Sequence, residues 1–248
     1  MRARRTRVAI VYGGRSAERD VSVMSARTVA AALDPSKYEI LPIRIDPEGR
    51  WSLERRFLEE LGGQRAWEAS EACRVALPPD GRGRELLLKD TNATLGGVDL
   101  IFPLLHGPCG EDGSIQGLAR LADLPCVGAD VLGSALCMDK NAAKRIMRDS
   151  GIPVAPFRTF RSPADARAAW PEIEAALGSD LFVKPANLGS SVGVSRARGR
   201  EEYERAVALA FEYDLKILVE RTMAGREIEV AVLGRGRMRA SLPGEVVP

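Results

Sequence analysis

The sequence predicts an α/β protein with an N-terminal parallel-sheet domain, followed from about residue 139 by a domain of α+β type. In the first half, apolar runs rich in β-branched residues end at glycines and alternate with helical patterns. Such runs are typical of parallel strands that are buried on both faces. In the second half, strands and helices follow one another without repeating that alternation, which indicates a different layout.

Composition agrees with a globular fold. The chain has 248 residues, of which 45% are hydrophobic and 28% charged, which excludes disorder and coiled coil. The net charge of +2 gives no basic excess for nucleic acid. The arginines at 2–7 fit a solvated leader better than a nucleic-acid tail. We expect no membrane span, because no apolar run approaches about 18 residues.

The cysteines and the histidine argue against zinc. The cysteines form no C-x-x-C pair, and His106 is the single histidine. Four cysteines in a chain of this length do not suggest a disulfide framework. We therefore expect a cytoplasmic protein.

The first half is expected to contain strands and helices in alternation. Helix 16–33 follows the first strand, and the spacing of Val21, Met24 and Thr28 predicts its buried face. A weakly patterned insertion at 51–97 is expected to hold a short helix and a hairpin. The other expected elements are strands 8–12, 38–45, 98–105 and 124–127 and helix 115–122.

The second half begins with helix 141–150, which Gly151 ends. Two strands are then expected around a Gly/Ser loop. The remaining expected elements are strands 181–185, 192–194, 215–220 and 228–233 and helix 201–211.

The Gly/Ser loop has the composition of a phosphate cradle. Gly189 and Gly193 permit positive φ and close approach to a ligand, Ser190 and Ser191 add donors, and Lys184 adds a cation. The order differs from G-x-x-x-x-G-K-[ST], since the lysine precedes the glycines. The alternative is a hairpin turn beside a surface lysine.

Lysine is scarce in a chain that uses arginine freely, and Lys140 stands where the organisation changes. A compact ammonium there suits phosphate oxygens. Chance placement on a solvated face is the alternative.

Three further residue groups have both a functional and a structural interpretation. Glu18, after the first strand, could hold a substrate ammonium or could complement a helix N-terminus. His106 ends a strand and precedes a glycine-rich loop, so it is catalytic or structural. Glu220 and Glu227 bracket a turn that could bind a purine and a ribose, or could simply be solvated.

Together these segments resemble the D-alanine–D-alanine ligases of the ATP-grasp superfamily. The conjunction is specific, although each motif alone is weak. The motifs are GGRSAERDVS at 13–22, HGxxGEDG at 106–113, MDK at 138–140, KPxxxGSSVG at 184–193, and VE and RE within 219–227.

The resemblance implies a reaction in which ATP and magnesium (or manganese) phosphorylate the carboxylate of one D-alanine. The amine of a second D-alanine then attacks the acyl phosphate, and the dipeptide enters peptidoglycan precursors. Glu18 and Ser190 would be catalytic, and His106 would lie beside the same substrate. The implied ATP-binding residues are Lys140, Lys184, Gly189, Ser190, Ser191, Val192, Gly193, Glu220, Thr222, Met223 and Glu227.

The resemblance also implies a division into an N-terminal domain at 1–138, a central ATP-grasp part at 139–226, and the start of a C-terminal part at 227–248. The metal-binding residues of the family are expected beyond Pro248, so an incomplete ATP-grasp domain is expected here. A homodimer is expected from the family.

Other classes remain as alternatives. They are a ligase joining D-alanine to D-lactate or D-serine, a non-catalytic ligase fragment, and another ATP-grasp enzyme such as a biotin carboxylase relative. An NAD-dependent oxidoreductase is disfavoured because G-x-G-x-x-G is absent.

Overall fold

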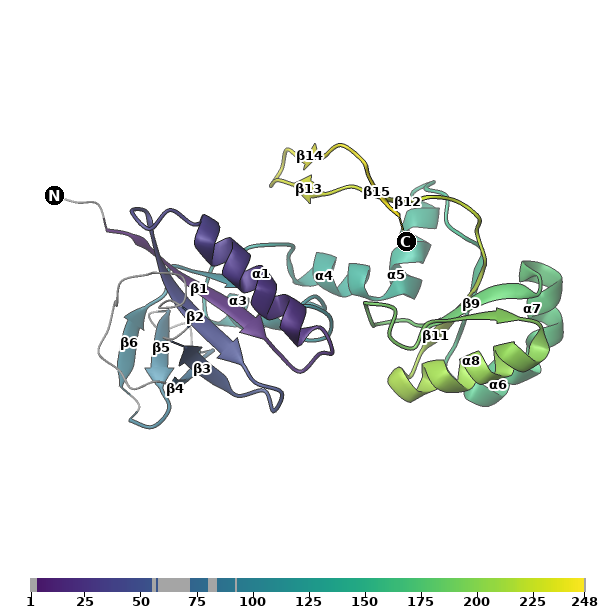
Figure 1. The fold of residues 1–248 in the computed structure, drawn as a ribbon, viewed down its shortest axis with the longest axis horizontal. Helices are drawn as coiled ribbons and strands as arrows, with labels where there is room; N and C mark the ends of the chain where they lie inside the picture. Colours follow the sequence, from purple (N-terminus) through teal and green to yellow (C-terminus); the bar gives the residue numbers. More distant parts are fainter. Residues whose placement is uncertain (1–3, 55–56, 58–71, 80–83, 92, 248) are drawn as a thin grey trace.

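The computed structural model describes residues 4–54, 57, 72–79, 84–91 and 93–247. Figure 1 shows two sheet-containing bodies, with helix α4 between them and a strand pair above. Among the described residues, a seven-stranded sheet has the order β6-β5-β4-β3-β2-β1-β7. A four-stranded sheet has the order β10-β9-β11-β8. The predicted α/β class, with a mixed second half, is confirmed.

The parallel part of the first sheet matches the expected strands closely. Its strands are β1 (Thr6–Gly13), β2 (Tyr38–Ile45) and β7 (Leu100–Pro103). β1 pairs in parallel with both β2 and β7. The turn after β1 requires glycine at Gly13, because its φ is +87° and a Cβ would lie 2.4 Å from the Ile45 carbonyl oxygen.

The described strands between residues 51 and 97 are part of the first sheet rather than a separate insertion. Its strands are β3 (Trp51–Glu54), β4 (Ala72–Ala76), β5 (Glu85–Leu88) and β6 (Thr94–Gly97). Each pairs antiparallel with the next, and β3 continues from β2. The predicted hairpin is therefore β5–β6, whereas the predicted short helix lies outside the described residues. Sequence missed the other strands because short, half-polar strands show little periodicity.

The buried face of α1 (Arg19–Ala32) differs from the prediction. Val21 and Met24 are 51% and 68% exposed, while Ser22, Ala26 and Ala30 are buried. Ala26 and Ala30 pack with Val8, Ile10 and Tyr12 of β1. Small residues let the helix approach the sheet closely, so side-chain size, and not hydrophobicity alone, selected the face.

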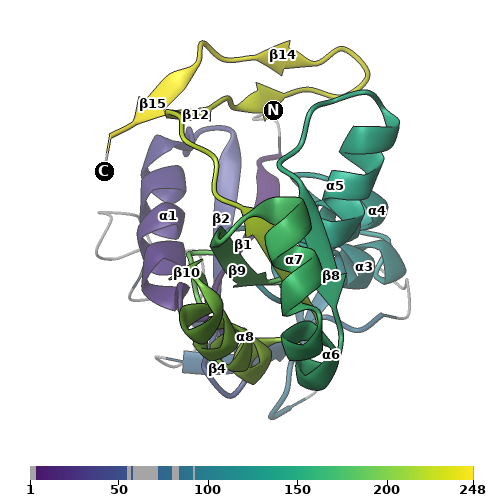
Figure 2. The same cartoon turned by 90° about the vertical axis from the view of Figure 1, so that its right-hand side faces the viewer.

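The opposite face of the sheet is covered by α3 (Ser114–Leu121), whose Ile115 and Ala119 pack on Ala9, Val11 and Leu41. Figure 2 shows α1 and α3 on opposite sides of the first sheet. The expected strand at 124–127 is reduced to one bridge between Ile101 and Cys126.

Two helices connect the bodies, α4 (Val131–Met138) and α5 (Lys140–Asp149). Asp139 accepts hydrogen bonds from the amides of Asn141 and Ala142 and caps α5. α5 confirms the helix expected at 141–150, and Gly151 follows with φ +76°.

The second body is an antiparallel sheet with helices packed on it. Ala206 and Val207 of α8 pack against Leu181 and Val183 of β9. The strands are β8 (Phe157–Phe160), β9 (Asp180–Pro185), β10 (Ser195–Arg198) and β11 (Ile217–Arg221). The helices are α6 (Pro163–Ala168), α7 (Trp170–Leu177) and α8 (Arg200–Tyr213).

The elements α4, α6, α7 and β8 were not predicted from the sequence, and one strand begins later than predicted. The expected strand 192–194 is a turn, and pairing with β9 begins at Ser195. The glycine at 193 has φ +68°, which interrupts an extended chain.

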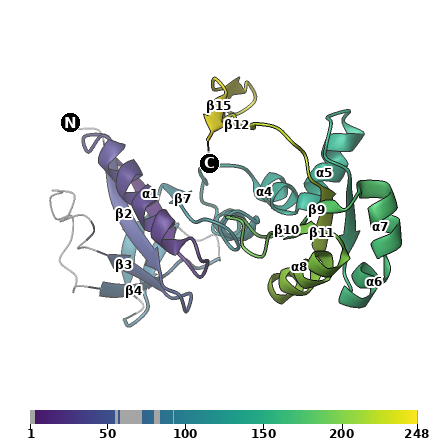
Figure 3. The same cartoon turned by 45° about the vertical axis from the view of Figure 1, so that its right-hand side comes forward.

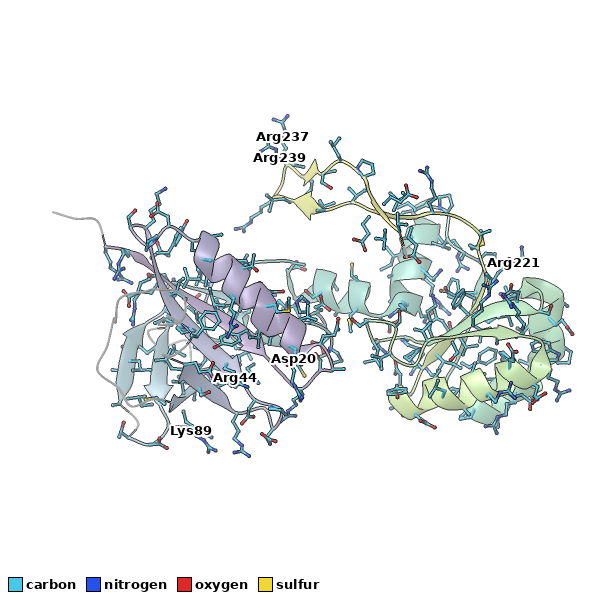
Figure 4. The ribbon with its side chains drawn as sticks, in the orientation of Figure 1. Asp20, Arg44, Lys89, Arg221, Arg237 and Arg239 are labelled. Atoms are coloured by element: carbon cyan, nitrogen blue, oxygen red, sulfur yellow. The ribbon has the colours of Figure 1, made fainter. Side chains whose placement is uncertain are left out.

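Residues 227–247 extend away from both sheets (Figure 3). The predicted strand 228–233 is broken in two. The strands here are β12 (Glu227–Glu229), β13 (Val232–Leu233), β14 (Arg239–Ala240) and β15 (Gly244–Val246). β12 pairs with β15 and β13 with β14, and all of these residues are exposed. Arg237 and Arg239 project from the tip of this strand pair (Figure 4). None of the helices in the described ranges is long and apolar enough to cross a membrane.

Candidate active site

Glu18 and Ser190 come together although they are 172 residues apart in sequence. Glu18 stands at the N-cap of α1, but its side chain makes no capping hydrogen bond. Its Oε1 instead accepts a hydrogen bond from the Ser190 hydroxyl. The carboxylate therefore faces the Gly/Ser loop of the second body and does not cap the amides of α1.

Two glycines crowd the same carboxylate. A Cβ at Gly107 would lie 3.3 Å from Glu18 Oε2, and one at Gly189 would lie 3.4 Å from it. His106 precedes Gly107, and its Nε2 lies 3.2 Å from the hydroxyl of Ser25 on α1. The ends of β1 and β7 and the Gly/Ser loop thus converge on Glu18.

Buried Ser22 holds the first two of these segments together. Its Oγ accepts from the Gly13 amide at 2.8 Å and donates to the Leu104 carbonyl at 2.6 Å. The carboxylate of Asp112 organises the loop after His106. Burial opposes its ionisation, but hydrogen bonds from the amides of Cys109 and Ser114 hold its pKa below the ordinary value.

The Gly/Ser loop takes a left-handed path, but not at both predicted glycines. φ is +46° at Ser190, +58° at Ser191 and +68° at Gly193. Gly189 has no positive φ, so that expectation was wrong, and its small size serves the approach to Glu18 instead. Non-glycine residues in this region store backbone strain, which is common at ligand sites. Successive left-handed residues also turn amides towards one side, as anion sites require.

Lys140 approaches the loop from the first turn of α5. Its Nζ donates to the Leu188 carbonyl, and its backbone amide donates to the Ala186 carbonyl. Burial lowers the pKa of the Lys140 ammonium, and the nearby Lys184 ammonium lowers it further. Phosphate oxygens would offset both effects.

Glu220 lies between two lysines. Its side chain is only 7% exposed, and its Oε2 lies 2.6 Å from Lys184 Nζ. Its Oε1 lies 3.0 Å from Lys144 Nζ. The two atoms form an ion pair, but their geometry is not that of a hydrogen bond. Glu220 Oε1 is therefore a buried acceptor that receives no hydrogen bond. An amino group of a nucleobase could donate to it.

Of the remaining residues expected to bind the nucleotide, three follow β11 and two lie in the Gly/Ser loop. The Thr222 amide donates to the Asp180 carbonyl, so it is occupied, and its hydroxyl donates to Asp180 Oδ1. Met223 is exposed, and exposed Glu227 pairs with Val246 in β12–β15. Ser191 and Val192 lie in the loop, where the Val192 amide donates to the Gly189 carbonyl.

Lys144, one helical turn from Lys140 on α5, was not predicted as a site residue. The four-residue spacing on α5 was the signal that could have found it. The hydrogen bonds from Asn187 to Asp214, which hold the chain before the Gly/Ser loop, were not predicted either, and the sequence offers no comparable signal for them.

In the part of the chain that the structure describes, no group of three or more His, Cys, Asp or Glu side chains could hold a metal ion. ATP is different. The unused acceptor Glu220 Oε1 fits the amino group of the adenine base. The ammonium groups of Lys140 and Lys184 and the left-handed loop fit the phosphates.

Comparison with known proteins gives the same assignment. The family model of the D-ala D-ala ligase N-terminus matches residues 7–129, and that of the C-terminus matches 146–248. D-alanine--D-alanine ligase A of Salmonella typhimurium is 44% identical in a match that covers 97% of this chain and 67% of that relative.

Two solved structures share the fold. The D-alanine-D-alanine ligase from Coxiella burnetii has a TM-score of 0.87 at 37% identity, covering 98% of this chain and 71% of that one. A D-Ala:D-Ser ligase from Enterococcus faecalis has a TM-score of 0.85 at 35% identity, covering 98% and 70%.

Fold and site together define an ATP-dependent ligase with an ATP-grasp fold. The chain belongs to the D-alanine–D-alanine ligase family. It spans about two thirds of the length of the relatives that it matches.

Proposed function

We propose that the protein joins two D-alanines in an ATP-dependent reaction through an acyl phosphate, for peptidoglycan precursor synthesis. The contact between Glu18 and Ser190 carries the proposal, because it joins the end of the first sheet to the Gly/Ser loop. A substrate bound at Glu18 would thus adjoin the loop that would hold the phosphates. The relatives named D-alanine--D-alanine ligase favour D-alanine over D-lactate or D-serine as the second substrate.

In this proposal, Glu18 holds the ammonium of the first D-alanine, supported by Ser190 and flanked by His106. The hydrogen bond between Glu18 and Ser190 supports the pairing, and the closeness of Gly107 to Glu18 supports the place of His106. A carboxylate oriented before the substrate arrives needs less reorganisation on binding.

Lys140, Lys184 and the loop residues Gly189, Ser190, Ser191, Val192 and Gly193 bind the ATP phosphates. Glu220, Thr222 and Met223 bind adenine, and Glu227 binds the ribose. The buried, unused acceptor at Glu220 supports the adenine role. Because the Thr222 amide is occupied, its contribution would be its carbonyl.

The loop would cover the phosphates and exclude water. An acyl phosphate hydrolyses readily, so water exclusion protects it until the second amine attacks. Catalysis would then depend on positioning and charge stabilisation.

The proposal includes Mg²⁺, with Mn²⁺ as a substitute, bound together with ATP. The described residues do not form a metal site of their own. A homodimer, a cytoplasmic location and the division at 1–138, 139–226 and 227–248 belong to the same proposal.

The test is phosphate release from ATP in the presence of amino acids. We expect release to require D-alanine and Glu18→Gln to abolish it, because a neutral amide cannot pair with the ammonium. Glu174→Gln, at an exposed position on α7, is the matched control and should behave as wild type. Equal release with L-alanine, or an active Glu18→Gln variant, would contradict the proposal.

Calorimetry addresses the alternative of a non-catalytic fragment. Mg-ATP should bind the 248-residue chain, and no detectable binding would favour that alternative. Dipeptide product analysis with D-alanine, D-serine and D-lactate separates the three second substrates.

A further inference from the structure

Asp214, at the C-cap of α8, anchors the Gly/Ser loop through Asn187, two residues before Gly189. Asp214 Oδ2 accepts from the Asn187 backbone amide at 2.8 Å and from Asn187 Nδ2 at 3.0 Å. Its Oδ1 accepts from the Lys216 amide at 3.1 Å. One carboxylate therefore binds the chain just before the loop and the start of β11.

A buried ion pair holds the same turn against α5. Lys216 is 7% exposed, and its Nζ donates to Asp139 Oδ2. Asp139 also caps α5, the helix that begins with Lys140. Burial opposes ionisation of Asp139, but the bonds from Lys216 and the α5 amides hold its pKa below the ordinary value.

Gly193, at the far end of the loop, lies against Tyr213, the residue before Asp214. A Cβ at Gly193 would lie 2.8 Å from the ring of Tyr213 and 2.9 Å from Pro185. Lys140 holds the middle of the segment through the Leu188 carbonyl. Asn187, before the loop, and Gly193, at its far end, thus both lie against residues 213–214. The turn at 213–216 is in turn bound to the start of α5 through Lys216 and Asp139.

We propose that Asp214 is a positioning residue, which through Asn187 sets the Gly/Ser loop at its working place relative to Lys140 and Glu18. This inference rests on the proposed function, since the loop's work is to hold the ATP phosphates. Asp214 would act through the Asn187 amide and side chain, both of which donate to its Oδ2.

Hydrogen exchange of the ligand-free protein tests the anchor directly. The Val192 and Val194 amides donate to the Gly189 and Ser191 carbonyls, so their exchange reports loop opening. We expect Asp214→Ala to speed this exchange about tenfold, because both Asn187 donors, the backbone amide and the side-chain Nδ2, lose their acceptor. Exchange in the interior of α8 and β11 should stay as in wild type.

Glu212→Ala is the matched control, an exposed carboxylate two residues earlier on α8, and it should leave the loop unchanged. Unchanged loop exchange in Asp214→Ala would overturn the proposal. Equal acceleration across α8 and β11 would also overturn it, because it would indicate general destabilisation.

Asn187→Ala keeps the chain foldable even where Asp214→Ala is not, because it removes only the side-chain bond. It should produce a smaller acceleration in the same amides, and the two substitutions together should add nothing to Asp214→Ala. Additive effects would show that Asp214 does not act through Asn187.

ATP titration separates this inference from the proposed function. Wild type and Glu212→Ala should bind Mg-ATP equally, and Asp214→Ala about tenfold more weakly. If wild type failed to bind ATP, the proposed function would fail, while the exchange result would still decide the anchor. Wild-type affinity in Asp214→Ala, with a loosened loop, would overturn the functional part of the inference.

Discussion

Glu220 is a buried carboxylate whose charge is balanced by lysines from two different elements. Lys184 comes from β9 and Lys144 from α5, and both contact it at 3.0 Å or less. Taking such charges out of water is costly unless each has a partner. The arrangement therefore holds two cations beside Glu220, at the proposed nucleotide site.

Glu220→Gln removes this charge with little change in size. We expect a loss of about 3 kcal/mol in the free energy of unfolding, because two partly buried ammonium groups would face each other without a counter-charge. ATP should bind more weakly, since Lys184 loses its fixed position. Urea unfolding and calorimetry measure the two effects.

Lys144→Met removes one of the two ammonium groups beside Glu220 and leaves Lys184 in place. It should lower ATP affinity less than Glu220→Gln, because the Lys184–Glu220 pair remains. Exposed Glu174→Gln again serves as the control. Wild-type ATP affinity in Glu220→Gln would remove this carboxylate from the nucleotide site.

At the scale of elements, Asp180 joins β9 to β10 and to the segment after β11. Its carboxylate accepts from Arg196 at 2.8 and 2.6 Å and from the Thr222 hydroxyl at 2.9 Å. The hydrogen bond from Arg196 is the main cause that lowers the pKa of Asp180 to about 2. The Asp180 side chain is 42% exposed, so its effect on stability is small.

The sign of the pH effect follows from that lowered pKa. The native state favours the ionised form, so Asp180 stabilises the fold above its ordinary pKa of 3.8. The contribution falls away as the pH drops towards about 2. We therefore expect Asp180→Asn to lower the urea midpoint by a constant amount at neutral pH, with the difference shrinking between about pH 4 and pH 2.

Unfolding of both proteins across that pH range, with Asp165→Asn on α6 as an exposed control, measures the effect. A difference that stayed constant down to about pH 2 would show that the charge of Asp180 is not its source.

At the scale of the whole molecule, the two bodies have separate cores. Leu86 belongs to the core of the first sheet, and Leu181 belongs to that of the second. Both side chains are almost fully buried. Since no core cluster of the described residues spans both sheets, each body should unfold as its own cooperative unit.

We expect two thermal transitions. Leu86→Ala should lower the temperature of only one transition, and Leu181→Ala that of only the other. Each substitution should reduce the free energy of unfolding of its own body by about 2–5 kcal/mol. ATP should raise the transition that Leu181→Ala lowers. A single transition that both substitutions shift equally would show that the bodies unfold together. Differential scanning calorimetry makes the measurement.

The sequence by itself determined the fold class, the strands β1, β2 and β9, the helices α5 and α8, and the family. These elements carry continuous apolar runs or clear start and stop residues, which are local signals. The motif spacing indicated the family because glycines and charged residues recur at fixed separations. Those same local signals located Glu18, Lys140, Lys184 and Ser190 in the chain.

Only the tertiary structure decided how these residues meet. The buried face of α1 was set by Ser22, Ala26 and Ala30, because close packing on β1 favours small side chains over the more apolar Val21 and Met24. The contact of Glu18 with Ser190, the lysines around Glu220 and the anchor at Asp214 join residues far apart in sequence. Such contacts depend on how sheets and helices stack, and no local pattern of residues encodes that stacking.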